Sequence, residues 1–164
     1  MKNVYLLALM LSAGAFAQSD PVVRWRGIEG VITAPGVDNP VGQIHSGGGP
    51  WTTRAGSARV NLDTGEGFFE VEGLVFNGGN ASGSTGTVTS VIGTLVCNVG
   101  STTSPVEAVT DTPAASLNAE GNAELSFKIN VPTTCNKPVF LIRVPSGRWI
   151  ATATKPATDS KSRY

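Results

Sequence analysis

Residues 121–131 read GNAELSFKINV, a stretch in which apolar and polar side chains alternate strictly. The apolar positions are Ala123, Leu125, Phe127, Ile129 and Val131. Because side chains of an extended chain point alternately to opposite faces, this segment would bury one face and expose the other. The pattern predicts a half-buried antiparallel strand, which Pro132 ends because proline has no N–H to donate to a sheet.

The chain has two cysteines, and both lie near predicted strand ends. Cys135 follows Val131 by four positions, and Cys97 ends an earlier apolar run. A disulfide between them would join the exit of the 121–131 strand to the end of the earlier strand. Closing a loop of roughly 40 residues stabilises a fold by about 4 kcal/mol on the chain-entropy estimate. The alternative is that both thiols are buried and free.

Residues 1–17 have the layout of a secretory signal peptide. Lys2 precedes an apolar run, and small residues then end in Ala15-Phe16-Ala17, an A-x-A cleavage site ahead of Gln18. No later segment approaches the roughly 20 apolar residues that a membrane span requires. We therefore expect a secreted, extracellular protein without a membrane span, in which an oxidising compartment pairs the cysteines.

The chain of 164 residues is expected to form one domain over 18–154, followed by a polar basic tail over 155–164. Its 12 Lys and Arg residues balance its 12 Asp and Glu residues, which gives a formal net charge of zero. A near-neutral protein has no electrostatic attraction for nucleic acids or anionic membranes, so we expect neither as a partner.

Other segments also have strand patterns, separated by turns rich in glycine and proline. Residues 22–33 predict one bulged strand or two short strands, and 87–97 predict a central strand with two apolar faces. A short strand is expected around 106–109. Hairpins are expected over 56–76, where Phe69, Val71 and Val75 share a face, and over 138–152.

About eight short strands, glycine-rich loops and one disulfide favour an all-β fold, a single antiparallel β-sandwich. No segment has a helical period. An immunoglobulin-like topology stays open, because the tryptophan expected between the two cysteines of that fold is absent.

Residues 34–51 predict a long loop that contains the only histidine, His45, and ends at Trp51. Loops of this length are usually functional or disordered. An exposed Trp51 would offer a flat surface for stacking on sugar rings, whereas a buried Trp51 would belong to the core. By alternation we expect Trp25 and Trp149 in the core. Trp51 and His45 are therefore the candidate ligand surface.

A hydrolytic site has few candidate residues. His45 would have to act as the base, yet no serine lies in a G-x-S-x-G elbow. Glu70 and Glu72 share a strand face at about 7 Å, as paired carboxylates of a glycosidase would. A solvated strand face explains the same pair, with Arg59 and Lys128 as expected neighbours on adjacent strands. We assign no catalytic residue.

Metal and cofactor sites are equally poorly supported. One histidine and two paired cysteines are too few ligands for zinc. The turn acids Asp38, Asp63 and Glu66 could hold calcium, but they lack the EF-hand spacing. The glycines of 47–49 are not followed by the lysine of a phosphate-binding loop. We expect no cofactor and no metal.

The segment 77–86 contains only glycine, asparagine, alanine, serine and threonine, and predicts a surface loop. It includes Asn80-Ala81-Ser82, the acceptor sequence for N-linked glycosylation. If the protein is eukaryotic, Asn80 is the expected glycosylation site.

In its signal peptide, size, single disulfide and β-rich pattern, the chain resembles the small secreted elicitor and effector proteins of plant-associated fungi. This resemblance implies a non-enzymatic interaction protein that engages an unknown host receptor and triggers host cell death or defence. The alternative is a carbohydrate-binding or adhesive module that binds an extracellular polysaccharide through Trp51. A small hydrolase that uses the strand acids is the third class.

Overall fold

A computed structural model describes residues 21–154. The predicted signal peptide (1–17) and basic tail (155–164) therefore lie outside the described residues. None of the described residues belongs to a helix with the length and apolar character needed to cross a membrane. The only helix in 21–154 is one short 3₁₀ turn, η1 (Gly79–Ala81), so the described chain is all-β.

The described part of the chain contains eleven strands. They are β1 (Val22–Trp25), β2 (Ile28–Gly30), β3 (Trp51–Thr52), β4 (Ala55–Asn61), β5 (Glu66–Glu72), β6 (Val75–Phe76), β7 (Ser90–Cys97), β8 (Ala108–Ser116), β9 (Ala123–Lys128), β10 (Val139–Arg143) and β11 (Trp149–Ala153). The number exceeds the expected eight because β2, β3 and β6 are two- or three-residue strands at the edges of loops.

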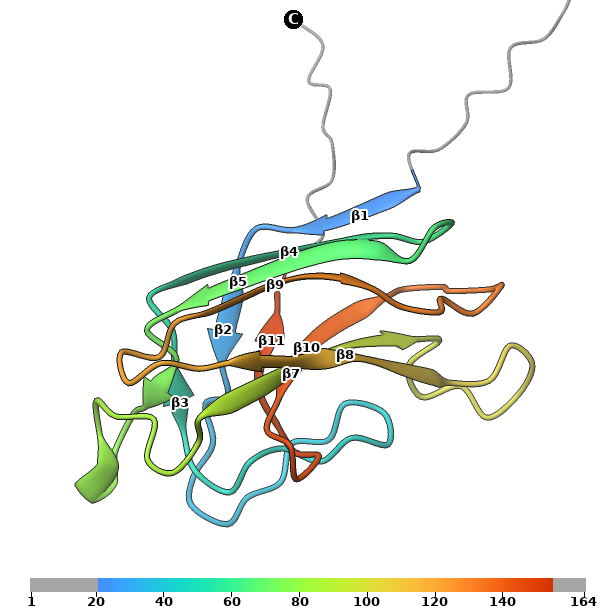
Figure 1. Ribbon diagram of the computed structural model, residues 1–164. Coiled ribbons are helices and arrows are strands. Elements are labelled where there is room, and N and C mark those ends of the chain that lie inside the picture. Colours follow the sequence, from blue (N-terminus) through green and yellow to red (C-terminus); the bar gives the residue numbers. More distant parts are fainter. Residues whose placement is uncertain (1–20, 155–164) are drawn as a thin grey trace, which may run out of the picture.

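The strands form two large antiparallel sheets and one small one. The four-stranded sheet has the order β1-β4-β5-β9, the five-stranded sheet has the order β2-β11-β10-β7-β8, and β3 pairs with β6. Figure 1 shows the two large sheets as layers, the four-stranded sheet above the five-stranded one. The chain first passes from one layer to the other at the short connection between β1 and β2.

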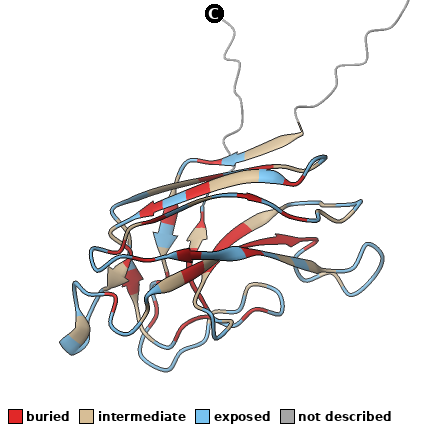
Figure 2. Ribbon diagram, viewed as in Figure 1, coloured by how far each residue is buried: buried red, intermediate tan, exposed pale blue. Residues whose placement is uncertain are grey.

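Aromatic rings join the two large sheets. The ring of Phe140 on β10 lies 5.8 Å from those of both Trp25 on β1 and Phe69 on β5, and 6.1 Å from that of Phe127 on β9. Figure 2 shows buried positions along both layers and exposed residues in the connecting loops. Trp25 and Trp149 are buried, as the alternation predicts.

The alternating stretch 121–131 contains β9, which pairs antiparallel with β5. Ala123, Phe127 and Ile129 are buried and Leu125 is half-buried, so the predicted inner face is confirmed. The hairpins β4–β5 and β10–β11 are confirmed too. At the second hairpin, Gly147 has a φ of 99°, a conformation that favours glycine.

Three sequence expectations need correction or refinement. The short strand expected around 106–109 is the nine-residue β8, which continues through Pro113 because β8 is an edge strand with a bulge opposite Gly93. Val75 does not continue the strand of Phe69. The left-handed Gly73 (φ 63°) ends β5 first, and Val75 starts β6. Residues 22–33 form two short strands, which join different sheets.

Cys97 and Cys135 form the predicted disulfide, so the free-thiol alternative is wrong. Cys97 ends β7 and Cys135 lies in the loop after β9. The backbones next to the bond also contact each other, because Asn98 N–H donates to the Asn136 carbonyl at 3.0 Å. The disulfide therefore connects the exit of β9 in one sheet to β7 in the other.

Candidate functional site

The long loop between β2 and β3 is ordered against the start of β11. The Trp149 indole N–H donates to the Asn39 carbonyl at 2.8 Å, and Arg148 donates to the Ser46 carbonyl at 2.8 Å. Backbone bonds add to this contact, from Gly47 N–H to the Trp149 carbonyl and from Trp149 N–H to the His45 carbonyl. The loop is thus packed onto the five-stranded sheet and is not a free surface segment.

A small polar cluster organises the inside of this loop. The Asp38 carboxylate accepts hydrogen bonds from the Ser46 N–H at 2.9 Å and from the Ser46 hydroxyl at 3.3 Å, and its second oxygen contacts Nδ1 of His45. The hydrogen bond with His45, followed by that from the Ser46 backbone, lowers the pKa of Asp38 below its ordinary value.

His45 is exposed, as expected, and Ser46 is almost fully buried. The Ser46 hydroxyl accepts from the Asn39 N–H, and its single hydrogen lies within reach of both Asp38 and the Gly47 carbonyl, each at 3.3 Å. A nucleophilic serine would instead bond to its histidine base. The contacts of Asp38, His45 and Ser46 therefore explain the shape of the loop.

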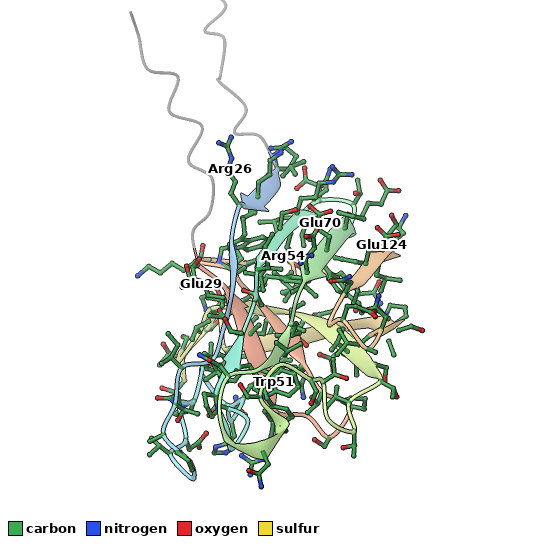
Figure 3. The ribbon with its side chains drawn as sticks, turned by 90° about the vertical axis from the view of Figure 1, so that its left-hand side faces the viewer. Arg26, Glu29, Trp51, Arg54, Glu70 and Glu124 are labelled. Atoms are coloured by element: carbon green, nitrogen blue, oxygen red, sulfur yellow. A yellow bond between two sulfur atoms is a disulfide. The ribbon has the colours of Figure 1, made fainter. Side chains whose placement is uncertain are left out.

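Trp51 is not an exposed stacking surface, and this correction removes it as the predicted ligand residue. Only 3% of Trp51 is exposed, and its ring lies 4.1 Å from that of Phe76. The pairing of β3 with β6 sets Phe76 directly opposite Trp51. Figure 3 shows Trp51 on β3, away from the acidic residues described next.

A groove lies on the side of the molecule where β8 and β9 border each other without pairing. Its volume is about 620 Å³. The groove is lined by side chains of β5, β8 and β9, of the turn between β8 and β9, and of Arg54, the residue before β4: Arg54, Glu70, Val71, Glu72, Ala114, Ala115, Ser116, Asn118, Asn122, Ala123, Glu124 and Leu125. We call it the edge groove.

Two strand edges open onto the edge groove. Ile129 N–H donates to the Gly65 carbonyl, so the odd-numbered residues of β9 direct their backbone groups toward β5. Glu124 and Ser126 direct theirs away from it. On β8, Leu117 N–H donates to the Thr89 carbonyl, which by the same alternation leaves the backbone groups of Ala114 and Ser116 outside the β7–β8 ladder.

Carboxylates gather at the same edge. Glu70 and Glu124 are directly opposite each other on β5 and β9, and like charges in that position destabilise a sheet. Glu70 accepts a hydrogen bond from the neutral Ser57, and Glu124 has no ion pair among the described residues. Figure 3 shows Glu70 and Glu124 on neighbouring strands at this edge, with Arg54 close to Glu70.

Arg59 and Lys128 lie on β4 and β9, the strands that flank β5, as expected, but neither forms an ion pair with Glu70 or Glu72. Arg59 lies over the Phe68 ring at 5.4 Å, and Lys128 approaches Glu66 at 3.9 Å. Glu72 instead pairs with Arg54 at 3.1 Å. Sheet register explains the difference, because it places Arg59 opposite Phe68 and Lys128 opposite Glu66.

The calcium hypothesis gains no support from the described residues. Asp38 lies in the loop before β3, whereas Asp63 and Glu66 lie at the turn between β4 and β5. Across residues 21–154 no three histidine, cysteine, aspartate or glutamate side chains are grouped as metal ligands. Asn80 is exposed in η1, a position open to modification.

Sequence reasoning missed Glu124, Asn118 and Asn122 as members of one site. Alternation placed Glu124 on the exposed face, but only the register of β5 with β9 brings it beside Glu70. The two asparagines hold the rim: Asn118 accepts from the Asn122 N–H at 2.8 Å, and Asn122 accepts from the Gly73 N–H at 3.0 Å.

Comparison of this chain with protein-family models, with curated proteins and with solved structures finds no match.

Proposed function

We propose that this chain is an exported, non-enzymatic interaction protein whose two large sheets form a β-sandwich scaffold. The edge groove is its binding surface. The observation that carries the proposal is the coincidence of two open strand edges with opposed, unneutralised carboxylates at one groove. Open edges and like-charge pairs both cost stability, so their occurrence together favours a role in binding.

Export agrees with the disulfide, because such bonds persist in oxidising compartments. The signal peptide expected at residues 1–17 also supports export. Intact mass of the secreted protein tests both features: a start at Gln18 and a two-proton gain on reduction are expected. A mass that still includes residues 1–17 would contradict export through this signal. A glycan that can be removed from Asn80 would indicate in addition that the protein comes from a eukaryote.

The groove favours a protein partner over a polysaccharide. No aromatic side chain lines it, and Trp51, the expected sugar-stacking residue, is buried. Sugar recognition commonly uses an exposed ring, whereas a row of open N–H and C=O groups suits a polypeptide. Retention of the purified protein on insoluble polysaccharides, lost in Glu124→Lys, would overturn this choice.

The narrower role follows from the resemblance to fungal elicitors and effectors. In that role the partner is a host receptor, and binding triggers cell death or a defence response. Infiltration of purified protein into leaves of several hosts should then cause necrosis or a defence burst. An inert protein in every host would contradict the role.

Matched variants connect this response to the groove. Glu124→Lys reverses the charge at the groove and should abolish the response. Glu29→Gln removes a carboxylate from β2, on the far edge of the other sheet, and should leave the response unchanged. Equal responses from Glu124→Lys and wild type would place the receptor surface elsewhere.

A further inference from the structure

We infer that the edge groove accepts an extended polypeptide segment, which adds to β9 as a further strand and carries basic side chains at alternate positions. This inference rests on the proposed function and names the chemistry of the partner. An added strand satisfies backbone groups that no residue of 21–154 satisfies, and alternate side chains provide the selectivity.

The backbone of β9 provides the first argument. Pairing with β5 uses the backbone N–H and C=O groups of Leu125 and Phe127. The backbone N–H and C=O groups of Glu124 and Ser126 point away from β5, to the open side. The strand contains neither proline nor glycine, so its outward donors and acceptors form an uninterrupted row. By contrast, Pro113 and the bulge opposite Gly93 interrupt β8. The added strand is therefore expected on β9.

Side-chain alternation provides the second argument. A strand beside β9 would place every second side chain on the outer face, next to Glu124 and one strand away from Glu70. A lysine or arginine in that position would neutralise the opposed carboxylates. The intervening side chains would face Leu125 and Ala115, which line the apolar part of the groove.

The two ends of β9 differ in charge, which sets a register. Lys128 lies at the other end of the strand, opposite Glu66. A basic residue beside Lys128 would be repelled, whereas one beside Glu124 would be attracted. The segment that fits best therefore has its basic residues at the groove end and a neutral or acidic residue near Lys128.

Binding of synthetic peptides to the full protein tests the inference. The probe is a blocked peptide of about eight residues, the length of a long strand, alternating lysine and threonine. The control peptide alternates glutamate and threonine. We expect the lysine peptide to bind at least about tenfold more tightly by fluorescence anisotropy, and Glu70→Gln with Glu124→Gln to remove most of this preference. Glu29→Gln should bind as wild type does.

Charge alone does not demonstrate strand addition, so the backbone is tested separately. In Ser126→Pro one outward N–H is lost, while every hydrogen bond of β9 to β5 is retained. This variant should lose binding of the lysine peptide, and Ser126→Ala should retain it. Binding to Ser126→Pro at wild-type strength would overturn the inference. If Ser126→Pro fails to fold, amide exchange of Ser126 in the wild type decides: slowing on peptide addition supports strand addition, and no change overturns it.

Failure of the inference and failure of the proposed function give different results. A leaf response that persists in Ser126→Pro would retain the function and overturn strand addition. Peptide binding together with an inert leaf assay would support strand addition and overturn the proposed role in the host. Equal binding of the lysine and glutamate peptides would overturn the basic character of the partner.

Discussion

The loop between β2 and β3 and the outer edge of β9 use their polar groups in opposite ways. In the loop, the Asp38 carboxylate and the Ser46 hydroxyl bond to other groups of the protein, and the Asn39 carbonyl accepts from the Trp149 indole of β11. At the edge, Glu124 has no ion pair in residues 21–154, and the outward backbone groups of β9 pair with no strand, although β8 lies near.

The sequence suggests the reverse assignment. The loop contains the only histidine and a tryptophan at its end, so it resembles a site, whereas β9 resembles an ordinary half-buried strand. In the structure, His45 and its neighbours Asp38 and Ser46 stabilise the conformation of the loop. Hydrogen-bonding capacity that the fold leaves unused is the better guide to a binding surface.

The largest expected effect concerns how β9 is held in place. Replacing both cysteines, Cys97→Ala with Cys135→Ala, opens a loop with a sequence separation of 38. The free energy of unfolding should fall by about 4 kcal/mol, measured by urea denaturation. The wild type under reductant is the control and should behave like the double variant. A loss below about 1 kcal/mol would mean that strand pairing alone holds the edge strand.

Two serines compare the loop and the edge directly. Ser46→Ala removes a buried hydroxyl with several partners and should cost about 1 to 2 kcal/mol of unfolding free energy. Ser126→Ala, on the outer face of β9, should change stability by less than about 0.5 kcal/mol. Chemical denaturation of both variants measures the difference. Equal losses would contradict the distinction between a satisfied loop and an open edge.

Acid should loosen the loop before the strands. The folded-state pKa of Asp38 is lowered, chiefly by its hydrogen bond with His45 and then by Ser46. The ionised carboxylate therefore stabilises the fold above its unfolded pKa of about 3.9, and this contribution is lost as pH falls through the lower folded value. The Trp149 indole N–H resonance, next to Asn39, should shift in that range. In Asp38→Asn the shift should be absent, and its persistence would assign it to another group.

The smallest effect is a gain in stability. Glu124→Lys replaces a like-charge pair across β5 and β9 with an opposite-charge pair and should stabilise the protein by about 0.5 kcal/mol. The gain should shrink as salt screens the charges. Thermal unfolding at low and high salt measures it. A loss of stability at low salt would mean that Glu70 and Glu124 do not repel each other.

Local patterns were sufficient for much of the fold. Alternation predicted the buried face of β9, and turn residues such as Gly147 predicted the last hairpin. Both signals are carried by neighbouring residues, so no knowledge of distant contacts is needed. The edge groove was unpredictable for the opposite reason. Glu70 and Glu124 are 54 positions apart, and only the sheet register makes them neighbours.

Two further outcomes have the same cause. The position of Trp51 at the end of a glycine-proline loop leaves both exposure and burial open, but β6 sets Phe76 against its ring. Lys128 and Arg59 lie on the strands that flank β5, as expected, but the register sets each opposite a residue other than Glu70. These outcomes depend on strand order and register, which a one-residue shift of pairing would change completely.

By itself, the sequence determined the all-β class, the antiparallel hairpins and the pairing of Cys97 with Cys135. Each depends on local periodicity, on turn chemistry or on there being only two cysteines. Tertiary structure alone decided that Trp51 is buried, which acids have a charged partner and which strand edge stays open. The physical reason is that burial and charge pairing are set by contacts between segments far apart in the chain, and the sequence of one segment does not specify its neighbour.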